Sequence, residues 1–286
     1  MERVNRRQRR RYYEARSKEK LQQYLIQLYN QGHTENEIAK LIDIPRGTVS
    51  RWMIEIGLKG RPCGEAGKVK SKRYRYDENF FATIDTPDKA YIVGFINGDG
   101  YIVDRGKSKR MGIVLSIADR QILEDIALYM EMQDMLKFHK ATYSNEQMKA
   151  SLIINCTKIC DDLIRLGISP QKTGKEQWLN FNRQDLQWAF IRGIFDADGH
   201  IYDHRSQRRW RKRFGITGSQ ALLNDILLFF KSKEIALGIN GLYKKQGCYD
   251  LHITSQKDLC RIYNEMYAYG TLKLNRKYEK FTSLMI

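Results

Sequence analysis

Apolar and polar positions alternate with two periods along this chain, and the order of these periods repeats. From residue 80, an apolar helical stretch precedes two stretches of strand-like alternation and a helix with one apolar face. Two further strand-like stretches and another helix follow, and the same order returns from residue 183. A repeated α-β-β-α-β-β-α order predicts a duplicated unit.

The register of the two copies is constant along the chain. Asp198 follows Asp99 by 99 residues, and Leu251 follows Leu152 by the same number. Thr86-Pro87-Asp88 predicts the start of the first repeated helix, because proline is tolerated in a first turn. The other predicted strands and helices are strands 101–103, 111–117, 136–142 and 149–155, helices 119–129 and 158–166, then strands 200–205, 211–217, 239–244 and 249–253 and helices 220–233 and 256–267.

One nine-residue phrase opens each copy, as Ile92–Gly100 and Ile191–Gly199. Each phrase is apolar and helical, carries small residues four apart, and ends in an aspartate followed by glycine, which predicts a helix end. Small residues at this spacing let two helices pack backbone to backbone. The sequence therefore predicts that the two helices pack together.

This packing would place Asp99 and Asp198 side by side at the negative ends of two helix dipoles. Two carboxylates in that position repel each other, and a divalent cation bound between them would relieve the repulsion. Either phrase alone is typical of an ordinary capped turn. The occurrence of two phrases in matching context favours a cation site.

The doubled phrase resembles the LAGLIDADG motif, and the resemblance to a single-chain, two-motif homing endonuclease covers roughly residues 80–282. Asn97 stands where the family usually has an acidic residue. The resemblance implies that Asp99 and Asp198 hold Mg²⁺, or Mn²⁺ or Ca²⁺ in a crystal, with the backbone carbonyls of Gly98 and Ala197. It also implies a double-strand DNA break with short 3′ overhangs.

Related enzymes place a lysine near each scissile phosphate, after the last helix of each half. The matching candidates here are Lys172 and Lys277, and Lys273 competes with Lys277. Each of these side chains is equally consistent with an ordinary surface lysine. The expected catalytic set is Asp99, Asp198, Lys172 and Lys277.

Residues 21–58 predict three short helices with apolar faces. Thr34 and Glu37 have the spacing of a capping box at the second helix, and a tight turn at 43–45 precedes the third. The segment resembles a helix-turn-helix DNA-binding unit, although any three-helix bundle has similar patterning. In such units the third helix enters the major groove. The residues expected to contact DNA there are Arg46, Thr48, Ser50 and Arg51.

These patterns predict an α+β protein in which a pseudo-twofold αββαββα LAGLIDADG fold follows a small all-α helix-turn-helix domain. Each half of the duplicated fold contributes an antiparallel DNA-binding sheet. The expected boundaries are a basic arm and helix-turn-helix domain at 1–58, a basic linker at 59–79, and the two LAGLIDADG halves at 80–182 and 183–286.

Composition supports a polyanionic partner. Lys and Arg number 50 against 33 Asp and Glu, which gives a net charge of +17, and 19 of the basic residues lie within residues 1–76. Such an excess favours nucleic acid over a membrane surface. Beyond the third helix, the expected DNA contacts are Lys70, Lys72, Arg73, Arg105, Lys107, Lys109, Lys137, Lys140, Arg205, Arg209, Arg211, Arg213, Lys244 and Lys245.

Cysteine usage and hydropathy indicate the compartment. The five cysteines are odd in number and form no CxxC pair, and no signal peptide or membrane span is evident. We therefore expect reduced thiols and a cytoplasmic, nucleoid-associated monomer that is not secreted and has no membrane partner. The Met-Glu start and the lack of a terminal His-Asn favour a free-standing enzyme over an intein, either intron-encoded or from a phage-type genome.

Two other functions remain open at the level of the sequence. A transcription regulator would keep the scaffold and the helix-turn-helix but lack cleavage. An RNA maturase would use the same basic surface to assist intron folding. The retention of both motif aspartates favours the nuclease.

Overall fold

The structure is a computed structural model that describes residues 18–60, 74, 76–140, 148–206 and 209–283. The side chains of residues 204–211 lie outside this description. The chain divides into two compact units, which meet in the sequence between Arg75 and Tyr76.

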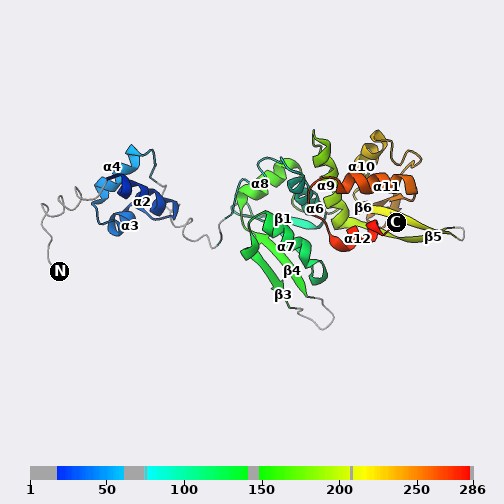
Figure 1. The fold of residues 1–286 in the computed structure, drawn as a ribbon, viewed down its shortest axis with the longest axis horizontal. Coiled ribbons are helices and arrows are strands. Elements are labelled where there is room, and N and C mark those ends of the chain that lie inside the picture. Colours follow the sequence, from blue (N-terminus) through cyan, green and yellow to red (C-terminus); the bar gives the residue numbers. More distant parts are fainter. Residues whose placement is uncertain (1–17, 61–73, 75, 141–147, 207–208, 284–286) are drawn as a thin grey trace. The chain divides into compact units, whose positions relative to one another are not determined.

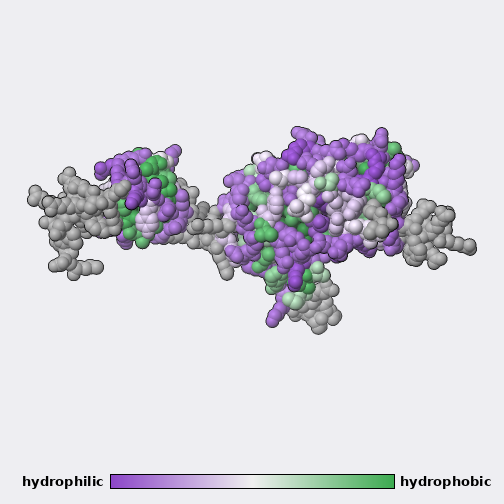
Figure 2. All heavy atoms as spheres, viewed as in Figure 1, coloured by the Kyte–Doolittle hydropathy of each residue, from purple (hydrophilic) through white to green (hydrophobic). Residues whose placement is uncertain are grey.

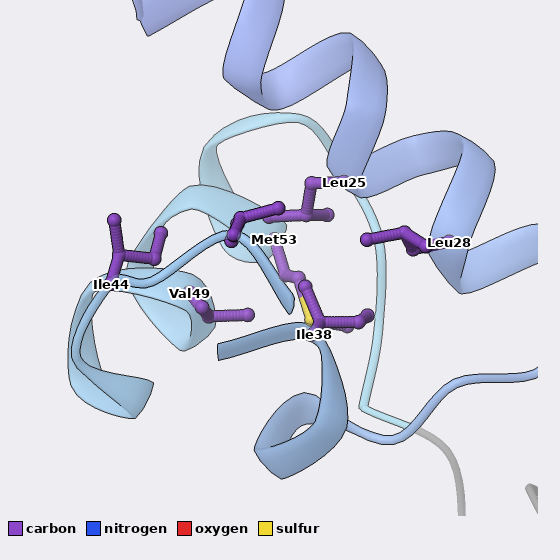
Figure 3. Close-up of a cluster of buried hydrophobic side chains, with 7 residues drawn as sticks. Leu25, Leu28, Ile38, Ile44, Val49 and Met53 are labelled. Atoms are coloured by element: carbon purple, nitrogen blue, oxygen red, sulfur yellow. The ribbon is translucent and has the colours of Figure 1, made fainter. Parts of the chain in front are cut away.

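Within the described part of the first unit, the chain forms three helices, as its apolar spacing predicts. They are α2 (Lys18–Asn30), α3 (Glu35–Leu41) and α4 (Arg46–Glu55). Their apolar faces meet in one cluster, drawn in Figure 3, that includes Leu25, Ile38, Val49 and Met53, each at most 2% exposed. Burial of these side chains supplies most of the driving force for such a small bundle.

A capping box starts α3. The Thr34 hydroxyl accepts a hydrogen bond from the backbone N–H of Glu37 at 3.3 Å, and the Glu37 carboxylate accepts one from the N–H of Thr34 at 2.9 Å. These bonds satisfy two backbone donors that have no partner within the helix. The predicted capping box is therefore confirmed.

Replacing Thr34 with alanine should destabilise α3. Loss of an N-cap hydroxyl costs about 1 kcal/mol, which corresponds to about fivefold faster amide hydrogen exchange in α3. The measurement is native-state exchange on the full chain, with Asn36→Ala as the matched control on the same helix. Asn36 is exposed, and alanine improves helix propensity there, so exchange should be unchanged or slower. Equal acceleration in both variants would contradict the role of the cap.

The second unit repeats one topology twice. In the first half the elements are α6 (Pro87–Asp99), β1 (Gly100–Asp104), β2 (Lys109–Ser116), η1 (Ile117–Asp119), α7 (Arg120–Tyr129), η2 (Gln133–Met135), β3 (Leu136–His139), β4 (Lys149–Ile154) and α8 (Thr157–Leu166). In the second half they are α9 (Gln184–Asp198), β5 (Gly199–Ser206), β6 (Arg209–Gly218), α10 (Gln220–Ser232), β7 (Tyr243–Lys245), β8 (Cys248–Ile253), α11 (Gln256–Tyr267) and α12 (Asn275–Thr282). The predicted αββαββα duplication is confirmed, and α12 is an additional helix.

Each half contains one four-stranded antiparallel sheet, and the two strand orders correspond. The orders are β1-β2-β4-β3 and β5-β6-β8-β7. Alternate residues such as Met111, Ile113 and Leu152 are buried on the face covered by helices, and the residues between them lie on the opposite face of the sheet. In Figure 1, α6 and α9 lie together, with the elements of the first half on one side and those of the second half on the other.

The motif helices start and stop where the local chemistry predicts. Thr86 caps α6 by accepting a hydrogen bond from the N–H of Lys89, and Pro87 occupies the first turn. Gly100 ends the helix with extended rather than left-handed backbone, at φ −78°. Glycine is needed there because a Cβ would lie 2.7 Å from the Ile96 carbonyl oxygen.

Candidate active site

The two motif helices meet backbone to backbone along their small residues. A Cβ on Gly193 would overlap the carbonyl oxygen of Tyr91 and lie 2.7 Å from the amide nitrogen of Phe95. A Cβ on Gly94 would likewise overlap the carbonyl oxygen of Phe190. Only glycine permits this approach. The close packing of the two helices also brings their C-terminal ends together.

The two motif aspartates meet at the end of this helix seam. Oδ2 of Asp198 would lie 2.7 Å from a Cβ on Gly98, the residue before Asp99. Both aspartate side chains retain exposed surface. The structure thus places the solvent-accessible carboxylate of Asp198 beside the residue that precedes Asp99, close enough for the charge of Asp99 to act on it.

The surroundings of these carboxylates disfavour their charged forms. Partial burial raises the pKa of Asp99, although Lys277 and Lys172 oppose the rise. Burial, and next the negative charge of Asp99, raise the pKa of Asp198 to about 6. Added positive charge between these carboxylates would stabilise their ionised forms.

Two buried lysines lie against the C-terminal ends of the motif helices. The Lys172 ammonium donates a hydrogen bond to the carbonyl oxygen of Gly98. The Lys277 ammonium donates to the carbonyl oxygens of Phe195 and Asp196 at 2.8 Å and of Ala197 at 3.2 Å. Each half therefore supplies a lysine to its own motif helix.

Burial lowers the pKa of both lysines. For Lys172 the neighbouring carboxylates of Asp198, Glu176 and Asp99 act in the opposite direction. The pKa of Lys277 falls to about 8, where Asp196 opposes the fall and Arg276 adds to it. These side chains differ from solvated surface lysines, because they remain close to carboxylates inside the protein.

Lys277 and its competitor Lys273 occupy different environments. Lys277 lies within α12 and is 6% exposed, whereas the sequence predicted that it would follow the last helix. The Lys273 ammonium lies over the ring of Tyr278, 4.5 Å from its centroid. Lys277 is therefore the lysine that donates hydrogen bonds to the backbone carbonyls at the end of the second motif helix.

The oxygen atoms at this junction fit a hard divalent cation. Mg²⁺ binds oxygen ligands, and both carboxylates and the carbonyls of Gly98 and Ala197 lie at the two helix ends. In the structure those carbonyls accept hydrogen bonds from the Lys172 and Lys277 ammonium groups, so both helix ends attract positive charge, and an ion would have to share these oxygens with the lysines. This preference follows from the negative ends of the helix dipoles.

Asn97 and Asp196 occupy corresponding positions and are both buried. The Asn97 side chain donates to the carbonyl oxygen of Gln177 at 3.0 Å. The Asp196 carboxylate accepts from the Tyr91 hydroxyl at 2.8 Å and from the Leu274 N–H at 2.7 Å, and burial raises its pKa to about 6. The departure from the family pattern at Asn97 therefore falls on a packing position, away from the exposed carboxylates.

Two groups near the carboxylates were not predicted from the sequence. Oε2 of Glu176 is buried and has no hydrogen-bond partner among the described residues, and Glu176 acts electrostatically on Lys172 and Asp198. In the sequence, the only indication of a role for Glu176 is its position four residues after Lys172. Arg276 donates to both carboxylate oxygens of Asp119 at 2.6 and 2.9 Å, joining the two halves beside Asp99.

The residues expected to contact DNA in the first unit lie on α4. Arg46 and Arg51 are exposed, and Thr48 and Ser50 are half-buried. The Nε atom of Arg46 lies 3.3 Å from the Glu35 carboxylate. The helix thus presents charged and hydroxyl groups on its surface. The linker candidates Lys70, Lys72 and Arg73 lie outside the described residues.

The basic residues expected on the sheets have different environments. In the first half Arg105, Lys107, Lys137 and Lys140 are exposed. Lys109 is instead bound to Asp104 at 3.1 Å and Asp161 at 2.6 Å, on the side of α8. Hydrophilic residues cover most of the visible face of this unit in Figure 2.

The second sheet shows a similar mixture. Lys244 and Lys245 are exposed on β7, whereas Arg213 is half-buried and donates to the Tyr202 hydroxyl at 3.0 Å. The backbones of Arg205, Arg209 and Arg211 belong to β5 and β6, and their side chains lie outside the description.

Of the helices that the structure describes, none has both the length and the apolar character needed to span a bilayer.

Comparisons with known families match a part of each unit. Residues 185–267 match the family described as LAGLIDADG-like domain, and residues 14–53 match the family described as homeodomain-like domain. Both matches agree with the resemblances found in the sequence. The first covers the second motif helix with Asp198, and the second covers α2, α3 and most of α4.

Solved structures with similar folds include two meganucleases. LAGLIDADG meganuclease I-AabMI bound to uncleaved DNA is 15% identical, with 70% of this chain and 89% of that chain covered and a TM-score of 0.48. I-SmaMI bound to an uncleaved DNA target with calcium ions is 12% identical, with 71% and 90% covered and a TM-score of 0.47.

A curated relative is the NrdEB subunit alpha of ribonucleoside-diphosphate reductase from Bacillus subtilis (strain 168), which is 23% identical over 133 residues. The similar region covers 43% of this chain and 12% of that protein. The corresponding protein of Bacillus phage SPbeta matches over the same extent.

Proposed function

We propose that this chain, which carries a LAGLIDADG-like domain and a homeodomain-like domain, is a site-specific endonuclease that cuts both strands of a DNA target. The observation that carries the proposal is the meeting of Asp99 and Asp198 at the end of the helix seam. Each carboxylate belongs to a different half, so each half can serve one strand of a duplex.

Asp99 and Asp198 would hold a divalent cation, Mg²⁺ in the first instance, together with the carbonyls of Gly98 and Ala197. When bound, Mg²⁺ supplies a lower pKa for coordinated water and compensates charge on the phosphate. The proximity of Asp198 to the end of α6 supports such shared ligation by the two halves.

Lys172 and Lys277 would stabilise negative charge on the two scissile phosphates. Their ammonium groups are held at the helix ends by backbone carbonyls, so they are positioned before DNA arrives. Preorganised charge of this kind acts strongly where protein excludes water.

The open faces of the two sheets would contact the major groove, and α4 would bind as a recognition helix. Arg105, Lys107 and Lys137 from the first sheet and Lys244 from the second are exposed for such contact. Long basic side chains reach both base edges and phosphates from a two-stranded ribbon.

The test is to incubate the full chain with Mg²⁺ and a DNA library, then to sequence the cleaved ends. We expect double-strand breaks at a defined site with short 3′ overhangs. Sequence-specific binding without cuts under Mg²⁺ or Mn²⁺ would indicate a transcription regulator. Preference for structured RNA over duplex DNA would indicate a maturase.

The two competing lysines give a further prediction. Lys277→Met should slow cleavage on the order of 10²-fold, because it removes a preorganised positive charge from the site. Methionine fills the buried position without an ionised group, but it leaves the carbonyls of Phe195, Asp196 and Ala197 without this donor, so circular dichroism must verify that the fold is retained. The measurement is single-turnover cleavage at saturating DNA, with Lys273→Met as the matched control. A larger loss in Lys273→Met would reassign the role to that residue.

A further inference from the structure

Three potential metal ligands gather on one face of the second sheet, opposite its buried apolar side chains. His200 lies on β5, and Asp250 and His252 lie on β8. Their ligand atoms all lie within 4.8 Å of one another, and among the described residues they form the one group of three or more His, Cys, Asp or Glu side chains this close together. Two imidazoles and a carboxylate are a common ligand set for zinc.

The distances between these atoms bracket those of a tetrahedral zinc site. Nε2 of His252 lies 2.7 Å from Oδ2 of Asp250, and Nε2 of His200 lies 4.0 Å from the same oxygen. Two ligands that each lie about 2.1 Å from a tetrahedral Zn²⁺ ion are about 3.4 Å apart. The two pairs that include Asp250 therefore each need a shift of less than about 1 Å, within reach of a side-chain rotation.

Surrounding groups hold the three side chains in place. Oδ1 of Asp250 accepts a hydrogen bond from the Thr217 hydroxyl at 3.3 Å. The ring of His252 packs against Tyr243 with centroids 4.6 Å apart, and that of His200 stacks on Tyr202 at 5.4 Å. Such supporting contacts orient metal ligands and strengthen binding.

The backbone beneath His200 is also suited to this arrangement. His200 pairs with Gly215 across β5 and β6, and a Cβ on Gly215 would overlap Nε2 of His200. Glycine therefore leaves the space into which this nitrogen points. A cavity of about 570 Å³ is lined in part by His252 and Tyr243, so one of the three ligands faces it.

The duplicated scaffold does not require this cluster. The positions 99 residues earlier hold Tyr101, Ser151 and Ile153. Tyr101 and Ile153 offer no imidazole or carboxylate, and the Ser151 hydroxyl bonds His139 Nε2 at 2.7 Å. The first sheet keeps the same strand order without the ligands, so the fold alone does not explain why they converge in the second.

We propose that His200, Asp250 and His252 form a binding site for a transition-metal ion of the Zn²⁺ class, separate from the carboxylates of Asp99 and Asp198. Imidazole nitrogen favours Zn²⁺ over Mg²⁺, whereas the motif site offers only oxygen. The Lys245 ammonium contacts Asp250 now, and its side chain is 47% exposed, so it can move into solvent when the ion binds.

The experiment is Zn²⁺ titration of the full chain by calorimetry without DNA, with Co²⁺ as a spectroscopic probe. We expect one Zn²⁺ per chain and visible Co²⁺ absorption typical of tetrahedral nitrogen and oxygen coordination. Replacing even a residue that supports a ligand costs about 10- to 100-fold in metal affinity, so His252→Gln should weaken binding by about 100-fold or more. His200→Gln should have a similar effect.

Matched controls separate this site from others. His139→Gln, on the first sheet, and the double variant Asp99→Asn/Asp198→Asn should bind Zn²⁺ as the parent chain does. Cys248→Ser should also leave binding unchanged. Circular dichroism of each variant verifies that the fold is retained.

Three results would overturn the proposal. They are absence of Zn²⁺ binding by the parent chain, unchanged affinity in His252→Gln, and near-ultraviolet absorption from Co²⁺ bound to thiolate. If zinc does not bind and His252→Gln instead weakens DNA binding, the cluster is a DNA contact. Because binding is measured without DNA, the outcome does not depend on the endonuclease activity.

Discussion

Asp198→Asn and Asp99→Asn are each expected to abolish DNA cleavage while DNA binding persists. Asparagine has nearly the same shape as aspartate but lacks the negative charge needed to hold a divalent cation. Loss of the electrostatic stabilisation at the scissile phosphate should reduce the cleavage rate on the order of 10³-fold. Because each carboxylate stands beside the other, either substitution should affect the whole site.

Neither substitution should damage the fold. The pKa values of both carboxyl groups are raised, which means that the protein disfavours their ionised forms. A neutral amide removes the repulsion between the two side chains, so stability should be unchanged or higher. This separates a catalytic effect from unfolding.

The measurement combines a cleavage assay with a binding assay on one DNA target. Asp134→Asn is the matched control, because Asp134 is an exposed aspartate in η2 of the same unit. It should cleave at the rate of the parent chain. Parent-level cleavage by either motif variant would contradict the proposed role of the carboxylates.

Gly193→Ala is expected to destabilise the second unit by about 3 kcal/mol, a large effect for one methyl group. The added Cβ would meet the backbone of Tyr91, Phe95 and Gly94, which can move only if the two motif helices separate. In an open helix the same change would stabilise by about 1 kcal/mol, because alanine has the higher helix propensity. The sign of the change in the free energy of unfolding therefore shows whether the two motif helices pack closely at Gly193.

Chemical denaturation of the full chain provides the measurement. Gly238→Ala is the control, because nothing lies within 4 Å of a Cβ at that position. It should leave the free energy of unfolding unchanged or raise it by about 0.4–1 kcal/mol. Higher stability in Gly193→Ala would show that the helices do not pack as closely as described. Separation of the helices should also reduce cleavage, since it separates Asp99 from Asp198.

Local pattern was sufficient for most of the architecture. The capping box at Thr34 and the proline start of α6 depend on residues a few positions apart, and both are present as expected. The doubled phrase also predicted the contact between α6 and α9, because glycine at matching positions permits close approach. The local pattern did not predict α12, because the segment is mostly polar although the side chains of Lys277 and Phe281 are buried.

Tertiary structure decided which side chains meet. Lys277 and Lys273 are indistinguishable by charge and spacing, and only the packing of α12 places Lys277 against the end of α9. His200 lies 50 residues before Asp250 in the chain, and the pairing of β5 with β6 and of β6 with β8 brings them together. Periodicity determines which face a residue occupies, whereas a site depends on the register between distant strands and helices. That register is set by packing of the whole core.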